Sequence, residues 1–150
     1  MKNLLGQAIF IAATAHRDQK DKGGKAYILH PLRLMMRLRT DDEELMQIAV
    51  LHDVFEDHGD VWCLNDLAVR GFSDRVINAL RILTHKKDQS YHDYIMSMVD
   101  NHDCIRVKIE DLRDNSDIMR LKGISEKDNA RIEKYHKYFL ILQEAGKKFQ

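Results

Sequence analysis

The segment "AVLHDVFEDHGD", residues 49–60, places four ionisable side chains directly after an apolar Ala-Val-Leu run. Positions four residues apart share one face of a helix, so His52 lies above Glu56 and Asp53 lies above Asp57. Neighbouring carboxylates are costly to bury unless a cation, protonation or solvent compensates them. The segment therefore predicts a helix that is apolar along its body and ends in a polar site.

Apolar side chains elsewhere in the chain recur at spacings of three and four, which is typical of amphipathic helices. No alternating run rich in Val, Ile and Thr predicts a strand. The helix that contains the opening segment is expected to start at a capping box formed by Thr40 and Glu43. The first helix is expected to end at Gly23 and Gly24, and the others start near Pro31, Asn65, Ser73, Ser90, Cys104 and Ser125. We expect an all-α fold, one bundle of about seven helices in a single domain over residues 1–150.

The composition limits the partners that this chain can have. Its 150 residues carry 24 Lys and Arg against 24 Asp and Glu, so no net field draws it to nucleic acid or an anionic membrane. This balance leaves room for a local basic patch. The apolar stretch 8–15 is shorter than the ~20 residues of a membrane-spanning helix, and two cysteines, Cys63 and Cys104, favour reduced thiols. We expect a cytoplasmic protein without a nucleic-acid or membrane partner, and a homo-oligomer stays open.

Histidine and carboxylate ligands together suit a divalent transition metal such as Mn, Fe or Zn. Two adjacent ligands require others from elsewhere in the chain, and His30, held before Pro31 at a helix start, is one candidate. Another is Asp111 in "VKIEDLRDN", residues 107–115, where Asp111 and Asn115 share a helical face. Taken singly, a His-Asp pair is also typical of a solvated helix end, and a charged run of an exposed face. Spacing alone leaves both interpretations open.

The order of these residues, a His, then a His-Asp pair, then an Asp, resembles that of the HD-domain metal-dependent phosphohydrolases. More closely, the chain is similar to the hydrolase domain of the RelA/SpoT alarmone enzymes and to the small alarmone hydrolases. The resemblance depends on four blocks in the same order: "AHRDQKDKGGKAYILHPLRLM" (15–35), "AVLHDVFEDH" (49–58), "VKIEDLRDNSD" (107–117) and "RIEKYHKYF" (131–139). It implies an all-α HD-domain fold over nearly the whole chain.

The resemblance also implies a role for each matching residue. The metal ligands would be His30, His52, Asp53 and Asp111, with Mn(II) as the ion. The catalytic acids, which orient a metal-activated water and manage its proton, would be Glu56 and Asp57. The nucleotide contacts would be Lys22, Asn115, Arg131 and Tyr135. Tyr135 also falls on the apolar stripe of its helix, so core packing is the alternative for this side chain.

The match departs from the family pattern in the turn before His30. Asp21 stands where the alarmone hydrolases carry an arginine that helps hold the guanine nucleotide, so no guanidinium is expected there to stack on the base. The implied function is hydrolysis of a phosphoester or pyrophosphate of a small nucleotide, as in the (p)ppGpp 3′-pyrophosphohydrolases. Two alternatives stay open: an HD-domain nucleotidase or phosphodiesterase acting on another nucleotide, and a metal or nucleotide sensor without turnover.

Overall fold

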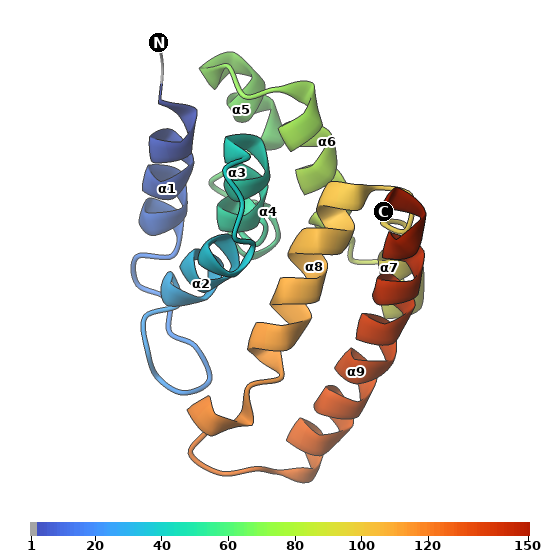
Figure 1. Cartoon of the computed structure of the whole chain (residues 1–150). Helices are drawn as coiled ribbons and strands as arrows, with labels where there is room; N and C mark the ends of the chain where they lie inside the picture. The colour runs from blue at the N-terminus through green and yellow to red at the C-terminus, as the bar shows by residue number, and fades with distance from the viewer. Residues whose placement is uncertain (1–2) are drawn as a thin grey trace.

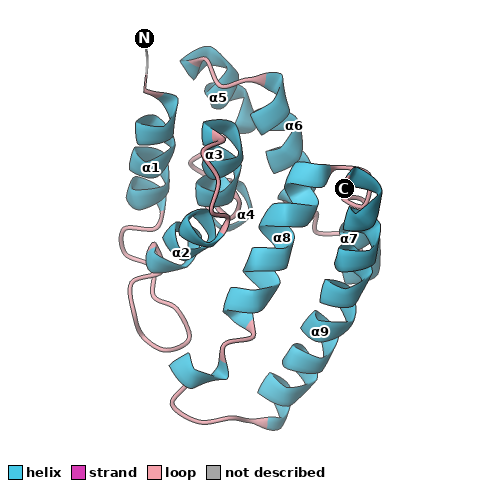
Figure 2. Cartoon of the chain, viewed as in Figure 1, coloured by secondary structure: helices cyan, strands magenta, loops and turns pink. Residues whose placement is uncertain are grey.

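The computed structural model describes residues 3–150, and this part of the chain is all-α (Figure 1). It contains nine α-helices and two short 3₁₀ helices, and no strand within the described range (Figure 2). In chain order they are α1 (Leu4–Ala15), α2 (Leu29–Arg37), α3 (Glu43–Leu51), α4 (Val54–Asp57), α5 (Leu64–Arg70), α6 (Asp74–Leu83), α7 (Tyr91–Met96), α8 (His102–Asn115), η1 (Ile118–Arg120), α9 (Glu126–Gly146) and η2 (Lys147–Phe149). The predicted fold class, a single helical bundle, is confirmed.

Helix α3 is the most buried helix of the bundle. It contacts α1, α2, α6 and α8, and its side chains Leu45, Ile48, Val50 and Leu51 are all fully buried. A helix that is apolar all round is covered on every side rather than along one stripe. The end of α3 therefore lies against α2 and α8, and α8 in turn lies beside the long α9 (Figure 1).

Three predicted helix starts are confirmed. Ser73, Ser90 and Ser125 are the N-caps of α6, α7 and α9, and each hydroxyl accepts a hydrogen bond from the backbone N–H three residues later. At Ser125 the carboxylate of Asp128 also accepts from the N-cap N–H, which completes a capping box. Each such cap satisfies backbone donors that the helix itself leaves unpaired.

The capping box expected from Thr40 and Glu43 is wrong. Asp42 is the N-cap of α3, and its carboxylate accepts from the N–H groups of Glu44 and Leu45. The Thr40 hydroxyl instead accepts from the N–H of Asp42 at 3.1 Å, before the helix begins. An ionised carboxylate at the positive end of the helix is a stronger acceptor than a hydroxyl, which explains the choice.

Two other boundaries differ from the predictions. α1 ends at Ala15 instead of the glycine pair, because the His16 imidazole turns to bond the Gln19 side chain at 2.8 Å and the chain leaves the helix there. Pro31 is the third residue of α2 instead of its first, still within the turn whose N–H groups have no intrahelical partner. None of the helices in the described residues is both long and apolar enough to span a membrane.

Candidate metal centre and active site

The polar residues of the 49–60 segment lie at a break between two helices. α3 ends at Leu51 and α4 begins at Val54, so His52 and Asp53 form the junction. Adjacent residues of a continuous helix point about 100° apart, whereas here both side chains reach the residues of α2 and α8 that face the junction. The expectation of one uninterrupted helix is wrong at this point, and the break is one reason that nine helices are found instead of about seven.

The four expected metal ligands come together at this junction. One ligand atom each from His30, His52 and Asp53 lies within 4.8 Å of the other two. The fourth, Asp111 of α8, places Oδ1 3.1 Å from His30 Nε2 and 3.7 Å from His52 Nε2. Asp53 Oδ2 lies 2.9 Å from His52 Nε2 and 3.5 Å from His30 Nε2. Residues separated by up to 81 positions thus surround one point.

The tautomers of the two histidines fit a cation at that point. His30 Nδ1 donates to Asp114 Oδ2 at 2.6 Å, and His52 Nδ1 donates to the Ala49 carbonyl at 2.8 Å. Because a carboxylate and a carbonyl can only accept, both Nδ1 atoms carry hydrogen, and each neutral ring then has a lone pair at Nε2. Both Nε2 atoms are buried without a hydrogen-bond partner. Lone pairs that face carboxylate oxygens require a positive charge between them.

The pKa values of the cluster also indicate that positive charge is stabilised at this point. Burial alone would lower the pKa of His30, but the three carboxylates around the ring outweigh it and raise this pKa to about 11. For His52 burial is likewise outweighed, chiefly by the charge of Asp53, and the pKa rises to about 9. The pKa values of Asp53 and Asp111 lie below the usual range, because the histidine and lysine charges outweigh their burial. Protons occupy such a site when no metal does, and metal binding releases them.

Lys108 is a site residue that the sequence interpretation missed. Its Nζ donates to Asp111 Oδ2 at 2.6 Å and lies 5.0 Å from the centre of the Tyr94 ring. Asn115 donates to Asp111 Oδ1 at 2.7 Å. Asp111 is therefore held from both neighbouring turns of α8. The spacing i, i+3 between Lys108 and Asp111 was visible in the sequence, but it is equally typical of an exposed ion pair.

Asp114 was also missed, because "EDLRDN" looked like an exposed charged face. It is fully buried. Besides His30, it pairs with Arg33 at 2.8 Å, with Arg37 at 3.0 Å and with Arg120 at 3.3 Å. Although burial alone would raise the pKa of Asp114, the charged partners hold it well below the usual range. A carboxylate behind a metal-binding histidine orients the ring and increases its basicity.

Glu56 and Asp57, the expected catalytic acids, line the same cavity as Asp53 and Asp111, a space of about 200 Å³. Glu56 Oε2 accepts from the backbone N–H of His85 at 3.1 Å. Burial raises the pKa of Glu56, which moves the carboxyl toward the range in which it can exchange a proton near neutral pH. Glu56 thus has a backbone donor and a raised pKa in the cavity that it shares with Asp53, Asp57 and Asp111.

Asp57 is held by a chain of polar side chains from the loop after α1 and from the end of α4. Gln19 Nε2 donates to Asp57 Oδ2 at 3.1 Å. Gln19 Oε1 in turn accepts from His16 Nδ1 at 2.8 Å and from His58 Nε2 at 2.9 Å. Two donors at one amide oxygen fix which way the Gln19 side chain points. His16 was noted in the sequence as a neighbour of the site, but Gln19 carried no signal beyond the block resemblance.

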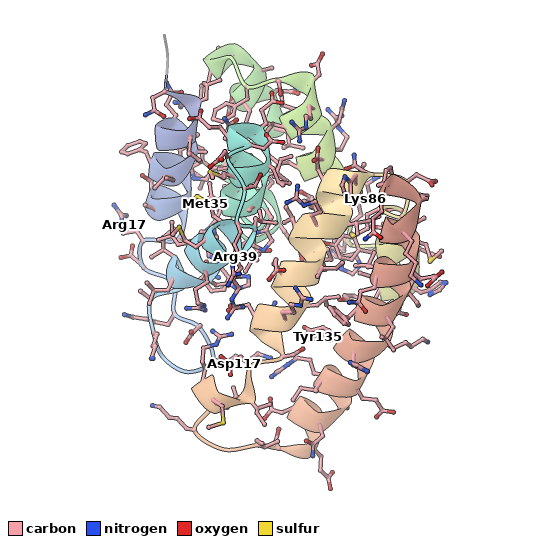
Figure 3. The ribbon with its side chains drawn as sticks, viewed as in Figure 1. Arg17, Met35, Arg39, Lys86, Asp117 and Tyr135 are labelled. Atoms are coloured by element: carbon pink, nitrogen blue, oxygen red, sulfur yellow. The ribbon has the colours of Figure 1, made fainter. Side chains whose placement is uncertain are left out.

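The four expected nucleotide contacts line a second cavity of about 250 Å³, formed in part by Lys22, Asn115, Arg131 and Tyr135. Tyr27, Asn115 and Tyr135 line both this cavity and the one at the metal cluster, so the two spaces adjoin. Figure 3 shows Tyr135 on the side of α9 that faces α8. The Tyr27 hydroxyl also donates to Asp53 Oδ2 at 2.5 Å. Tyr135 is packed against the core as well, so both predicted roles are compatible with its position.

A guanidinium is present where the sequence suggested that one was missing. Arg120 of η1 lies in the wall of the second cavity and pairs with Asp21, with 3.4 Å between Nη1 and Oδ2. Arg120 is also held by the backbone carbonyl and the side chain of Asp114. Asp21, which stands at the position of the family arginine, is thus paired with an arginine 99 positions later in the chain. Arg131, the arginine already expected as a nucleotide contact, lines the same cavity.

No family model matches the chain, whereas several curated proteins do. It is 31% identical over 138 residues to the guanosine-3′,5′-bis(diphosphate) 3′-pyrophosphohydrolase of Vibrio cholerae, an alignment that covers 85% of this chain and 19% of that protein. It is 32% identical, with the same coverage, to the bifunctional (p)ppGpp synthase/hydrolase SpoT of Escherichia coli. The Aquifex aeolicus pyrophosphohydrolase is 29% identical over 73% of this chain and 17% of its own length. The chain thus spans about a fifth of the length of these relatives.

Proposed function

We propose a function for this chain from the premise that it belongs to the family of the guanosine-3′,5′-bis(diphosphate) 3′-pyrophosphohydrolases. The proposed function is that of an HD-domain metal-dependent phosphohydrolase acting on a small phosphorylated nucleotide. One observation carries the proposal. Two buried imidazole Nε2 atoms without hydrogen-bond partners face two carboxylates, beside a cavity lined by further acids. The first substrate to test is guanosine-3′,5′-bis(diphosphate), and the bond to be cleaved is the one that releases the 3′-pyrophosphate.

The proposed metal ligands are His30, His52, Asp53 and Asp111, and Mn(II) is the ion that the family resemblance implies. Nitrogen and carboxylate donors in this ratio suit such an ion. When bound, it stabilises charge on the phosphoryl oxygens and lowers the pKa of a coordinated water into the neutral range. Lys108 and Asn115 hold Asp111, and Asp114 holds His30, so the protein keeps the ligands oriented through hydrogen bonds behind them.

Glu56 and Asp57 are the residues proposed to move the proton of the attacking water. The pKa of Glu56, raised by burial, suits a group that takes up a proton and returns it. Asp57 keeps one direction because Gln19 donates to it. Both carboxylates lie in the cavity at the metal cluster and outside the set of ligands. Substituting either one should therefore reduce turnover while metal binding persists.

The adjoining cavity is proposed to hold the nucleoside part of the substrate. It offers the cations Lys22, Arg120 and Arg131 and the ring of Tyr135. Arginine and aromatic side chains recognise phosphates and base faces. Asn115, at the boundary of the two spaces, lies where the ribose would pass between them. A single domain, a cytoplasmic location and the absence of a nucleic-acid or membrane partner remain predictions, and this proposal does not depend on them.

The test is pyrophosphate release from guanosine-3′,5′-bis(diphosphate) by Mn(II)-loaded protein, followed by ion-exchange chromatography. Asp53→Asn should lose both bound Mn(II) and turnover. Glu56→Gln should keep the metal and lose roughly 100-fold or more in kcat. The matched control is Asp60→Asn, an exposed carboxylate just after α4, which should behave like the wild type. A metal-loaded wild type that cleaves no nucleotide in a broad panel would contradict the proposal.

The second candidate is an HD-domain nucleotidase or phosphodiesterase with another nucleotide as substrate. The ion pair between Asp21 and Arg120 favours it, because the cation of this wall comes from a different segment than in the alarmone hydrolases. The comparison is turnover of guanosine-3′,5′-bis(diphosphate) against nucleoside monophosphates and cyclic nucleotides. Higher kcat/KM for a substrate without a 3′-pyrophosphate would select this candidate.

A further inference from the structure

A third cavity lies on the other side of α8 from the metal cluster. It measures about 550 Å³ and is bounded by the end of α2, by α8, by the end of α9 and by η2. Figure 1 shows the end of α9 beside the start of α8. The α8 side chains that face it include Ile105, Arg106, Ile109 and Arg113. At about 100° per residue, Arg106, Ile109 and Arg113 point away from the face of the helix that carries Asp111.

This cavity, which we name the α8 groove, carries more cations than acids in its lining. Its lining includes the permanent cations Arg37, Arg106, Arg113 and Lys147 against the single acid Glu110. The whole chain has a formal net charge of zero, so this excess belongs to one face. A concentration of one sign of charge in a concave surface attracts counter-charged ligands.

Two guanidinium groups of the α8 groove are already held in place. Arg37 Nη1 lies 3.0 Å from Asp114 Oδ1, and Arg113 Nη1 lies 2.6 Å from Glu110 Oε1. Lys147 pairs with Glu144, an exposed ion pair that a ligand can displace. Arg106 makes no ion pair within residues 3–150, so its charge is available to a ligand. Guanidinium groups fixed beforehand lose little side-chain entropy when they bind an anion, and their planar fork matches the oxygens of a phosphate.

The shape and the remaining lining narrow the class of ligand. The volume is in the range of small-molecule sites, and Leu38, Ile105 and Ile109 provide an apolar wall beside the cations. Among the described residues, no Phe, Tyr or Trp lines the groove. Single-stranded nucleic acid is held by aromatic stacking along an extended basic track, so a small ligand fits better than RNA.

We propose that the α8 groove binds a small phosphorylated anion through its diphosphate or triphosphate group, at a site separate from the candidate active site. Arg106, Arg113 and Lys147 contact the phosphates, and the apolar wall contacts a nucleoside where the ligand carries one. Binding depends on the charges of this face alone, so it does not require the proposed hydrolase activity.

The experiment is a calorimetric titration of chelator-treated protein with inorganic tripolyphosphate, repeated with GTP and ATP. Arg106→Gln should weaken binding about tenfold or more, as expected for one charge-assisted contact. Lys147→Gln, an exposed position, should weaken it in the same direction and serves as the second variant if Arg106→Gln unfolds. The matched control is Arg81→Gln, an exposed cation of α6 that lines neither cavity, which should leave the affinity for tripolyphosphate within about twofold. Tighter binding of a nucleotide than of tripolyphosphate assigns a role to the apolar wall.

Three results would overturn the proposal. The first is no binding of tripolyphosphate or nucleotide by the wild type at about 1 mM, the weak end of specific affinity. The second is loss of binding in Arg131→Gln with none in Arg106→Gln, which would assign the ligand to the nucleotide cavity. The third is a short RNA that binds more tightly than tripolyphosphate and depends on Arg106, which would make the groove a nucleic-acid surface.

Discussion

Replacing Asp114 by Asn is the sharpest single test of how the metal centre is built. The substitution keeps the size of the side chain and removes the charge that faces His30, Arg33, Arg37 and Arg120. One Asn oxygen can still accept from His30, but the amide nitrogen then points at a guanidinium as a donor. We expect losses of both stability and metal affinity.

The size of each loss follows from burial. Breaking a buried ion pair costs about 3–5 kcal/mol. Asp114 is fully buried, but the side chains of Arg33 and Arg37 are 28% and 39% exposed and can be rehydrated. The expected cost is therefore at the lower end, about 3 kcal/mol, which corresponds to a fall in Tm of roughly 6–12 °C for a chain of this length. Loss of a carboxylate behind a metal-binding histidine lowers metal affinity about 10–100-fold.

Two measurements check this prediction. Thermal unfolding of chelator-treated protein, followed by circular dichroism, gives the change in stability, and calorimetric titration with Mn(II) gives the change in affinity. Asp117→Asn is the matched control, because its carboxylate is 3.6 Å from Arg120 and its side chain is 36% exposed. A pair of this kind contributes less than about 1 kcal/mol. If Asp114→Asn keeps the Tm and the Mn(II) affinity of the control, the described arrangement behind His30 is wrong.

Three further predictions concern the acid, the cap and the core. Gln19→Leu removes the donor to Asp57 and should lower kcat more than it raises KM; an unchanged kcat would show that Asp57 needs no such support. Asp42→Asn keeps an N-cap but loses the charged pair with Arg75. That pair lowers the pKa of Asp42, so its stabilisation of at most about 1 kcal/mol is present above the unfolded pKa and is lost as the pH falls through the folded one. Urea unfolding should therefore show a larger wild-type advantage at pH 7 than at pH 3. Ile48→Ala, at a fully buried position of α3, should cost about 2–5 kcal/mol in the same assay, and a cost below about 1 kcal/mol would contradict the central place of α3.

Much of the fold was predictable because local signals decide it. Ser73, Ser90 and Ser125 each combine a capping side chain with an amphipathic run behind it, and all three start helices as expected. The break at His52 and Asp53 was not predictable, since residues 43–57 all tolerate helix and the junction is set by contacts with α2 and α8. Long-range packing decides such details over propensity.

The candidate site also combines residues that the sequence predicted with residues whose position only the packing of the helices decides. The grouping of the four expected ligands followed from a family resemblance and is reproduced by the distances, although their role as ligands stays a proposal. Asp114 and Arg120 could not be foreseen, because a buried carboxylate and an exposed one look alike in a charged run. Only the approach of α2 and η1 to the end of α8 makes Asp114 buried.

The position of His52 and Asp53 directly after the most protected helix has a consequence for how the site can move. We expect amides in the last turn of α3, whose side chains are fully buried, to exchange hydrogen mainly when the whole chain opens. Two of the four proposed ligands continue that turn without an intervening loop. We therefore expect the geometry of this junction to persist as long as the chain stays folded, so that a rigid frame and not a closing lid would set the preference among cations.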